Sequence, residues 1–196
     1  MTLKQTLLRW AYPFLMWGNK IGKKNVVIEH GESKPIFPFH QLSITLANGA
    51  PFRFDVLKGK KVLLVNTASD CGYTAQYKEL QQLYSRNRDK LVVIAFPSNE
   101  FKEQEKGSNS EIETFCQKNF GVEFPVAQKC NVLPGTRQET VYSWLTNHNV
   151  NGWNKQKPVW NFCKYLVNEK GLLTHYFSPS VSPLGKEIAR AIGGIS

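Results

Sequence analysis

The chain has 196 residues and a mass of 22.3 kDa, enough for one domain with a sizeable core and a short extension. Hydrophobic residues make up 41% and charged residues 20%, a composition that argues against a disordered chain. The formal net charge of +10 favours acidic partners or anionic surfaces. Because the sequence shows no nucleic-acid motif and no arginine-rich cluster interleaved with aromatics, we expect no nucleic-acid partner.

The N-terminal segment is basic and amphipathic. Residues 1–28 contain five Lys or Arg and no acidic residue, and apolar residues recur at helical spacing across residues 3–17. No apolar run reaches the roughly 20 residues that span a bilayer, and Arg9 interrupts the segment, which disfavours a secretory signal. Residues 3–17 therefore predict a helix in peripheral contact with a membrane, a helix docked on the domain or a partner subunit, or a disordered arm.

We divide the chain into an amphipathic helix and linker over residues 1–38 and a single domain over residues 39–196. Residues 25–40 contain Pro and Gly with little periodicity, which is typical of a linker or a covering arm. A β-hairpin follows, in which "SITL" and "FRF" flank "ANGA". Asn48-Gly49 is typical of a tight hairpin turn because both residues tolerate positive φ.

The rest of the chain alternates strands and helices. The predicted elements are a buried strand over Val62–Val65, a helix over Thr74–Asn87, a buried strand over Leu91–Phe96, a helix beginning near Ser110, a helix over Glu139–Asn147, a hairpin of residues 162–167 and 172–177, and a last helix with Pro183 at its first position. Ser110 and Glu113 are expected to form a capping box, and Gly121 to end that helix. This order predicts an α/β fold with one sheet covered by helices.

Four cysteines, Cys71, Cys116, Cys130 and Cys163, are widely spaced and form no C-x-x-C pair. This spacing excludes a zinc finger and a thioredoxin-type dithiol, and it predicts reduced thiols in a cytoplasmic compartment. Cys71 follows a buried strand and precedes a helix, whose dipole is expected to lower the pKa of the thiol. A thiolate that attacks a peroxide becomes a sulfenic acid, although by position alone Cys71 could equally be structural.

Three stretches, "NTASDCGYTAQY", "FPSNEFKEQEKGSN" and "WNFCKYLV", resemble signature regions of the glutathione peroxidase family in the family's order and spacing. The resemblance extends from about Phe39 to Ile192. It implies a thioredoxin-like fold, with a central mixed sheet flanked by helices and an N-terminal β-hairpin. It also implies a thiol-dependent peroxidase that acts on hydrogen peroxide and organic hydroperoxides and needs no cofactor or metal.

The resemblance places the peroxidatic residue at Cys71 and its supporting groups at Gln104, Trp160 and Asn161. The Gln104 amide and the Trp160 indole N–H can donate hydrogen bonds to the thiolate and to the departing oxygen. Asn161 can donate too, or it can hold the neighbours of the cysteine in place. Without the resemblance, Gln104 would be read as a solvated loop residue and Trp160 as a core aromatic.

A second cysteine often condenses with the sulfenic acid in family members that lack selenocysteine, and thioredoxin reduces the disulfide. The resemblance gives this resolving role to Cys116, although some members place the thiol at the position of Gln117. A disulfide needs Cα atoms within about 7 Å, so the helix of Cys116 would have to unwind locally. The alternatives are a buried structural Cys116 and glutathione as the reductant, and Cys130 and Cys163 are expected to be packed, inert thiols.

Two departures from the family pattern carry expectations of their own. Glu100, Lys102 and Glu103 depart from a more usual Gln-Phe-Gly-Gly run, which predicts a stiffer loop before Gln104. The insertion that tetrameric relatives use for assembly is missing between residues 129 and 153, which predicts a monomer with an open site for bulky hydroperoxides and a protein reductant.

Two rival functions remain open. In the first, Cys71 senses peroxide and relays its oxidation to a partner protein, without catalytic turnover. In the second, a thioredoxin-like protein handles copper; this is weak because His30, His40, His148 and His175 match no ligand spacing around the cysteine.

Overall fold

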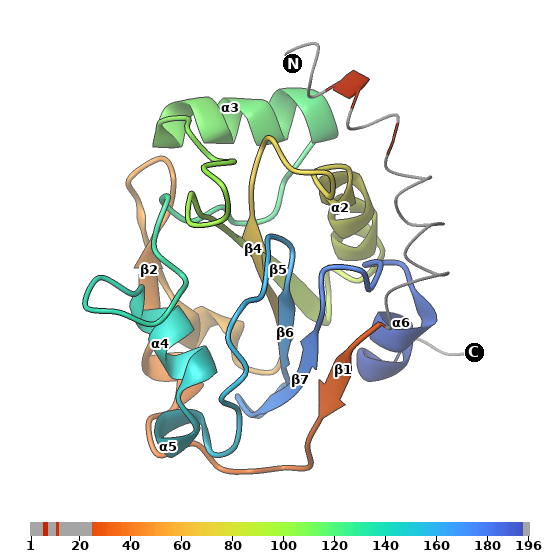
Figure 1. Ribbon diagram of the computed structural model, residues 1–196. Helices are drawn as coiled ribbons and strands as arrows, with labels where there is room; N and C mark the ends of the chain where they lie inside the picture. Colours follow the sequence, from red (N-terminus) through yellow and green to blue (C-terminus); the bar gives the residue numbers. More distant parts are fainter. Residues whose placement is uncertain (1–5, 8–10, 12–24, 194–196) are drawn as a thin grey trace.

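The computed structural model describes residues 6–7, 11 and 25–193 of the chain (Figure 1). Its elements are β1 (Val27–Glu29), the 3-10 turns η1 (Phe39–Gln41) and η2 (Phe54–Leu57), β2 (Ser43–Thr45), β3 (Pro51–Arg53), β4 (Lys61–Thr67), α2 (Gln76–Arg86), β5 (Leu91–Pro97), α3 (Asn109–Phe120), α4 (Thr140–Thr146), α5 (His148–Asn151), β6 (Lys164–Val167), β7 (Leu173–Phe177) and α6 (Lys186–Ala191).

Five strands form one mixed sheet in the order β1-β7-β6-β4-β5. β4 and β5 are parallel, because α2 carries the chain from the end of one strand back to the start of the next. The pairs β4–β6, β6–β7 and β1–β7 are antiparallel, and helices cover the sheet (Figure 1). The predicted α/β fold with a central mixed sheet is confirmed.

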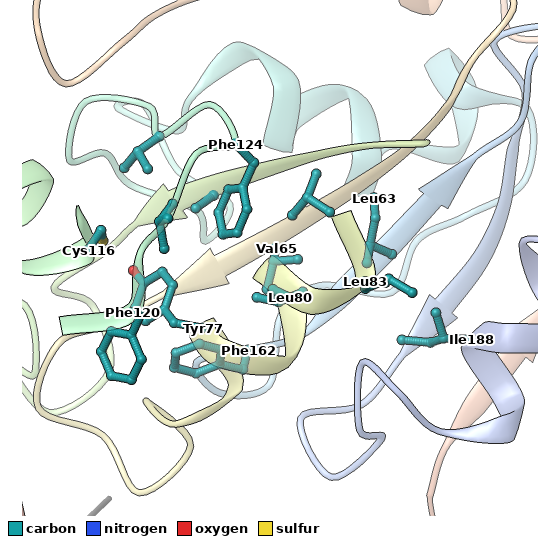
Figure 2. Packing of buried hydrophobic residues seen from close by; sticks show 14 of the residues in the cluster. Leu63, Val65, Tyr77, Leu80, Leu83, Cys116, Phe120, Phe124, Phe162 and Ile188 are labelled. Atoms are coloured by element: carbon teal, nitrogen blue, oxygen red, sulfur yellow. The ribbon is translucent and has the colours of Figure 1, made fainter. Parts of the chain in front are cut away.

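The core lies on both faces of this sheet, and alternate residues of β4 belong to opposite faces. Leu63 and Val65 pack in a cluster with side chains from α2, α3 and α6, part of which Figure 2 shows. Val62 and Leu64 pack on the other face with η1, η2 and α4. All four side chains are fully buried, as their continuous apolar run predicts for a central strand. Each contributes about 1.5–3 kcal/mol relative to an exposed side chain.

The N-terminal hairpin is present as a separate two-stranded sheet of β2 and β3. The tight turn predicted at Asn48-Gly49 is confirmed, and Gly49 has a positive φ, of 86°. Asn48 uses its side chain, and its Oδ1 accepts the Ala50 N–H at 3.0 Å. The turn therefore needs a left-handed backbone at Gly49 but not at Asn48, whose amide closes it.

One capping box and one helix start differ from the prediction. α3 begins at Asn109, and its capping box pairs Ser108 with Glu111 rather than Ser110 with Glu113. The spacing of three residues was correct, but an equivalent Ser and Glu lie two positions earlier in the chain. The last helix begins only at Lys186, after an N-cap at Gly185. The expected ends of α3 at Gly121, with φ 63°, and of α4 at Asn147 are confirmed.

The start of the described chain adds a strand that the sequence did not predict. Residues 27–29, within the expected linker, pair with β7 as the edge strand β1. Three residues with little burial leave no periodicity for sequence reasoning to find. Of the helix predicted over residues 3–17, only Thr6, Leu7 and Ala11 are described, and the rest lies outside the described residues. In the part of the chain that the structure describes, no helix is sufficiently long and apolar to cross a membrane.

Candidate active site

Cys71 lies in the turn between the end of β4 and the start of α2. Thr74 holds this turn: its Oγ1 accepts the Cys71 N–H at 3.0 Å and donates to the Ala68 carbonyl at 2.9 Å. The Thr74 N–H also donates to the Cys71 carbonyl at 3.0 Å. Three hydrogen bonds around one buried threonine therefore fix the position of the thiol.

Three N–H groups favour a negative charge on the Cys71 sulfur. The Tyr73 backbone N–H lies 3.5 Å from Sγ. The side chains of Trp160 and Asn161, from the turn before β6, act to lower the pKa of the thiol. These groups come from segments about 90 residues apart in the sequence, and each stabilises a negative charge on sulfur.

Asn66, at the end of β4, places the turn that carries Trp160. Its side-chain Nδ2 donates to the Trp160 carbonyl at 2.9 Å, and its Oδ1 accepts the Cys163 N–H at 3.1 Å. The Asn66 carbonyl accepts the Phe162 N–H at 2.6 Å. Sequence reasoning missed this role of Asn66. The available signal was a polar residue at the end of a buried apolar strand, directly before the Cys71 segment.

Gln104 contacts the site through Asn161. The Asn161 Nδ2 donates to the Gln104 Oε1 at 2.9 Å, and the Gln104 carbonyl accepts the Asp70 N–H at 3.0 Å. The structure thus brings all four predicted residues together. Among the described residues, however, the groups that shift the pKa of Cys71 include Trp160 and Asn161 but not Gln104. Here the Gln104 amide oxygen orients Asn161, rather than its N–H groups facing the thiol.

The loop before Gln104 has an unusual backbone. Lys102 and Glu103 have φ of 53° and 51°, in the left-handed region that glycine adopts at least cost. These are the two positions where the family resemblance leads one to expect glycines. Glu100 ties the start of this loop to the segment of Val132 and Leu133. Its carboxylate accepts their backbone N–H groups at 2.5 and 2.9 Å. The loop is held in a conformation that its own residues disfavour.

Burial raises the pKa of the Cys71 thiol above its ordinary value, because only 1% of the residue is exposed. Hydrogen bonds from Tyr73, Trp160 and Asn161 act in the opposite direction, and the nearby Asp70 carboxylate adds to the rise. The expectation of a lowered pKa at Cys71 is therefore wrong for the resting protein. Desolvation outweighs the donors, and α2 begins only after the turn.

Two hollows flank the Cys71 turn. Tyr73 and Trp160 line one of about 610 Å³, together with Val159 and Pro179. Asp70, Gln104 and residues of α3 line the other, of about 280 Å³. The side chains beside the buried thiol therefore border open space on both sides of the turn.

Cys116 lies within α3 and is fully buried in the same cluster as Cys71. Burial raises its pKa to about 12. The Tyr77 hydroxyl of α2 lies beside the thiol (Figure 2) and acts to lower this pKa. Both thiols are free, so the structure corresponds to the reduced protein.

The other two cysteines lie in packed surroundings. Cys163 is buried, with its Sγ 3.3 Å from the Tyr176 hydroxyl, and Cys130 is partly buried. Burial raises the pKa of both thiols. Among the described residues, no group of three His, Cys, Asp or Glu side chains could hold a metal ion.

Comparison with known proteins gives consistent matches. The sequence pattern named "Glutathione peroxidase" matches residues 39–146, more than half of the chain. Glutathione peroxidase-like peroxiredoxin 2 of Saccharomyces cerevisiae is 42% identical over 146 residues, which cover 74% of this chain and 90% of that protein. The glutathione peroxidase homolog BsaA of Halalkalibacterium halodurans is 40% identical over 146 residues, which cover 74% of this chain and 92% of that protein.

Solved structures agree with these matches. The crystal structure of T. cruzi GPX1 aligns with a TM-score of 0.61 at 25% identity, over 79% of this chain and 94% of that chain. A DsbF homologue from Corynebacterium diphtheriae shares the fold alone, with a TM-score of 0.62 at 13% identity over 89% of this chain and 94% of that one. The fold is thioredoxin-like, and the chain belongs to the glutathione peroxidase family.

Proposed function

We propose that this peroxidase reduces hydrogen peroxide and organic hydroperoxides through the thiolate of Cys71. The sulfur attacks the peroxide, an S–O bond forms as the O–O bond breaks, and water or an alcohol leaves. The observation that supports this role is the convergence of the Tyr73, Trp160 and Asn161 donors on one buried sulfur. In a desolvated site such donors stabilise both the thiolate and the charge that develops on the leaving oxygen.

We propose that Cys116 then condenses with the Cys71 sulfenic acid to give a disulfide and water. Because Cys116 is buried within α3, its helix has to open for the two sulfurs to meet. The C-terminal end of α3 is the natural place, because Gly121 ends the helix with a left-handed backbone only five residues after Cys116. The Gly121 N–H and the Val122 N–H, the latter at 3.3 Å, both donate to the Cys116 carbonyl, and unwinding the last turn has to break these bonds.

Thioredoxin is the reductant that we propose for this disulfide. The relatives named glutathione peroxidase-like peroxiredoxins support a thiol-based cycle of this kind. Glutathione is the second candidate, and it would reduce the sulfenic acid directly without any need for Cys116.

A peroxide-sensing relay is the alternative function. The full burial of Cys116 and its pKa of about 12 favour this alternative, because a slowly resolving thiol leaves the Cys71 sulfenic acid time to react with a partner. A sensor of this kind reduces peroxide only stoichiometrically, whichever reductant is supplied.

We also propose that residues 39–196 act as a monomeric domain in the cytoplasm and that residues 3–17 bring it to anionic membrane surfaces. The widely spaced free thiols support a reducing compartment, and the basic, acid-free segment 1–28 supports membrane contact. Co-sedimentation of the full chain with phosphatidylserine vesicles, but not with phosphatidylcholine vesicles, is the expected result. Sedimentation with neither, or equally with both, contradicts the membrane proposal.

The experiment that tests the peroxidase cycle is steady-state consumption of hydrogen peroxide and of a lipid hydroperoxide. It is run with thioredoxin and thioredoxin reductase, and separately with glutathione and glutathione reductase. Turnover with thioredoxin alone is expected. Turnover with glutathione alone assigns Cys116 a structural role, and turnover with neither favours the sensor.

A further inference from the structure

Glu105 is a buried carboxylate directly behind the Cys71 turn. The residue is 1% exposed, and its two carboxylate oxygens lie 2.8 and 3.0 Å from the hydroxyl of Ser69, which donates to them. Its backbone N–H donates to the Asn99 Oδ1 at 2.9 Å. No ion pair neutralises the Glu105 carboxylate within the described residues. A buried acid that is fixed in place without a cationic partner needs a reason.

The carboxylate shares a hollow with both segments that carry the proposed redox thiols. Glu105 lines the hollow of about 280 Å³ together with Ser69 and Asp70, which directly precede Cys71. Ile112 and Phe115 of α3 line the same hollow. These two residues precede Cys116 by one helical turn and by one position, so the hollow borders both the Cys71 turn and the Cys116 helix.

A second polar group, the Tyr77 hydroxyl, lies in the same region. It lies beside the Cys116 thiol in an otherwise largely apolar cluster (Figure 2). The Glu105 carboxylate interacts electrostatically with both Tyr77 and Cys116. This interaction opposes a negative charge on Cys116 while Glu105 is ionised, so the two groups compete for one negative charge.

We propose that Glu105 takes the proton of the Cys116 thiol as this thiol condenses with the Cys71 sulfenic acid. This inference rests on the resolving role proposed for Cys116. In the step, the Cys116 sulfur attacks the Cys71 sulfur, an S–S bond forms and the S–O bond breaks. The thiol sulfur is oxidised and the sulfenic sulfur is reduced. The oxygen leaves as hydroxide and becomes water by taking up a proton, while Glu105 holds the thiol proton until it returns to solvent.

The charges around Glu105 suit this role. Burial raises the pKa of its carboxyl to about 7, against hydrogen bonds from Ser69 that lower it, and a carboxyl with this pKa can accept a proton near neutral pH. The remaining groups that face it are the Lys129 ammonium, which lowers the pKa, the Asp70 carboxylate, which raises it, and the Tyr77 and Cys116 side chains. Three further charged residues line the hollow but are engaged elsewhere: Glu103 and Lys106 pair with each other at 3.4 Å, and Glu111 caps α3.

The test follows the two chemical steps separately in the full chain. Reduced protein is mixed with hydrogen peroxide, quenched at intervals with a sulfenic-acid probe and an alkylating agent, and analysed by mass spectrometry. Glu105→Gln keeps the size of the side chain and an oxygen that can accept from Ser69. We expect disulfide formation in this variant to slow by about 10-fold or more at pH 8, within the usual effect of a general base, while sulfenic acid formation at Cys71 changes little.

The pH profile and a matched control complete the experiment. In the unmodified protein, the rate of disulfide formation is expected to rise through pH 7 as Glu105 ionises and then to level off, and Glu105→Gln is expected to lose this rise. Glu113→Gln is the control, because Glu113 also interacts electrostatically with Cys116 but is only partly buried on α3. This control is expected to keep the rate and the profile.

Four results overturn the proposal. Equal slowing of both steps in Glu105→Gln means that Glu105 merely supports the Cys71 turn. An unchanged rate of disulfide formation in Glu105→Gln means that Glu105 takes no proton. A pH profile of the unmodified protein without a rise near pH 7 means the same, and this measurement does not depend on the folding of any variant. If Cys116→Ser still forms an intramolecular disulfide with Cys71, the resolving role itself fails, whatever Glu105 does.

Discussion

The side-chain amide of Asn161 donates a hydrogen bond to the Gln104 Oε1 at 2.9 Å, across 57 residues of sequence. This bond joins the turn before β6 to the loop after β5, and the Gln104 carbonyl in turn accepts the N–H of Asp70, next to Cys71. Two hydrogen bonds thereby link the three segments that carry the site. Asn161 acts directly on the pKa of the thiol, whereas Gln104 contacts Asn161.

Asn161→Ala is expected to slow sulfenic acid formation by about 10- to 100-fold, because it removes a donor to the thiolate that is worth roughly 1.5–3 kcal/mol. Trp160→Phe should have an effect of the same order. Gln104→Ala should slow the step less, since this side chain acts through Asn161. Stopped-flow measurements of the rate of sulfenic acid formation compare the three variants, and circular dichroism checks that each variant is folded. An effect of Gln104→Ala as large as that of Asn161→Ala would show that Gln104 touches the reacting atoms.

Cys71→Ser is expected to abolish peroxide reduction. Cys116→Ser should consume one equivalent of peroxide in a burst and then stop in the presence of thioredoxin, because no disulfide can form. Cys130→Ser is the control and should turn over normally. The measurement is the amount of peroxide that each of the three variants consumes per mole of protein. Full thioredoxin-linked turnover of Cys116→Ser would contradict the proposed cycle.

The pKa of Cys71 is raised by burial, so the thiol is expected to be mostly protonated at neutral pH. Alkylation of Cys71 by iodoacetamide should therefore accelerate with pH into the alkaline range and show an apparent pKa above the ordinary value of about 8.5. Asn161→Ala should raise this apparent pKa further, since it removes a hydrogen bond to the thiolate. An alkylation rate that already levels off below pH 7 would show that the donors outweigh desolvation.

Lys102→Gly and Glu103→Gly are each expected to raise the free energy of unfolding by about 0.5–1 kcal/mol, because both residues have a left-handed backbone. Urea denaturation measures the change, and Lys106→Gly, whose φ is not in that region, is the matched control that should not gain stability. Lower stability of both glycine variants would mean that the loop gains more from their side chains than it loses in backbone strain.

Lys164 is fully buried on β6, and its Nζ donates to the carbonyls of Pro179 and Val181 at 3.2 and 2.5 Å. Burial lowers its pKa to about 7, whereas the unfolded chain keeps the ordinary value near 10.4. Between these values the unfolded state binds more protons, so this residue makes the free energy of unfolding rise with pH by up to about 1.4 kcal/mol per unit. Lys164→Met should lose this part of the rise between pH 7 and 10. Parallel stability profiles of the two proteins would contradict the shift.

Much of the fold could be predicted because its signals are local. The apolar run at Val62–Val65 indicates a strand buried on both faces, and Gly121 indicates a helix end, and both predictions are confirmed. Predictions failed where several local solutions compete. Ser108 and Ser110 each have a Glu three residues later, so spacing alone could not choose between two capping boxes. β1 left no periodicity because it is a three-residue edge strand.

By itself, the sequence determined the order of the elements, the family resemblance and the positions of Cys71, Gln104, Trp160 and Asn161. These depend on the identity and spacing of neighbouring residues. Only the tertiary structure decided how the four residues meet, how the thiol titrates and where Glu105 lies. Burial and electrostatic interactions depend on which distant segments pack together. A local sequence pattern therefore does not show how far packing desolvates a given side chain. The raised pKa of Cys71 and the burial of the Glu105 carboxylate beside the Cys71 turn are consequences of that packing.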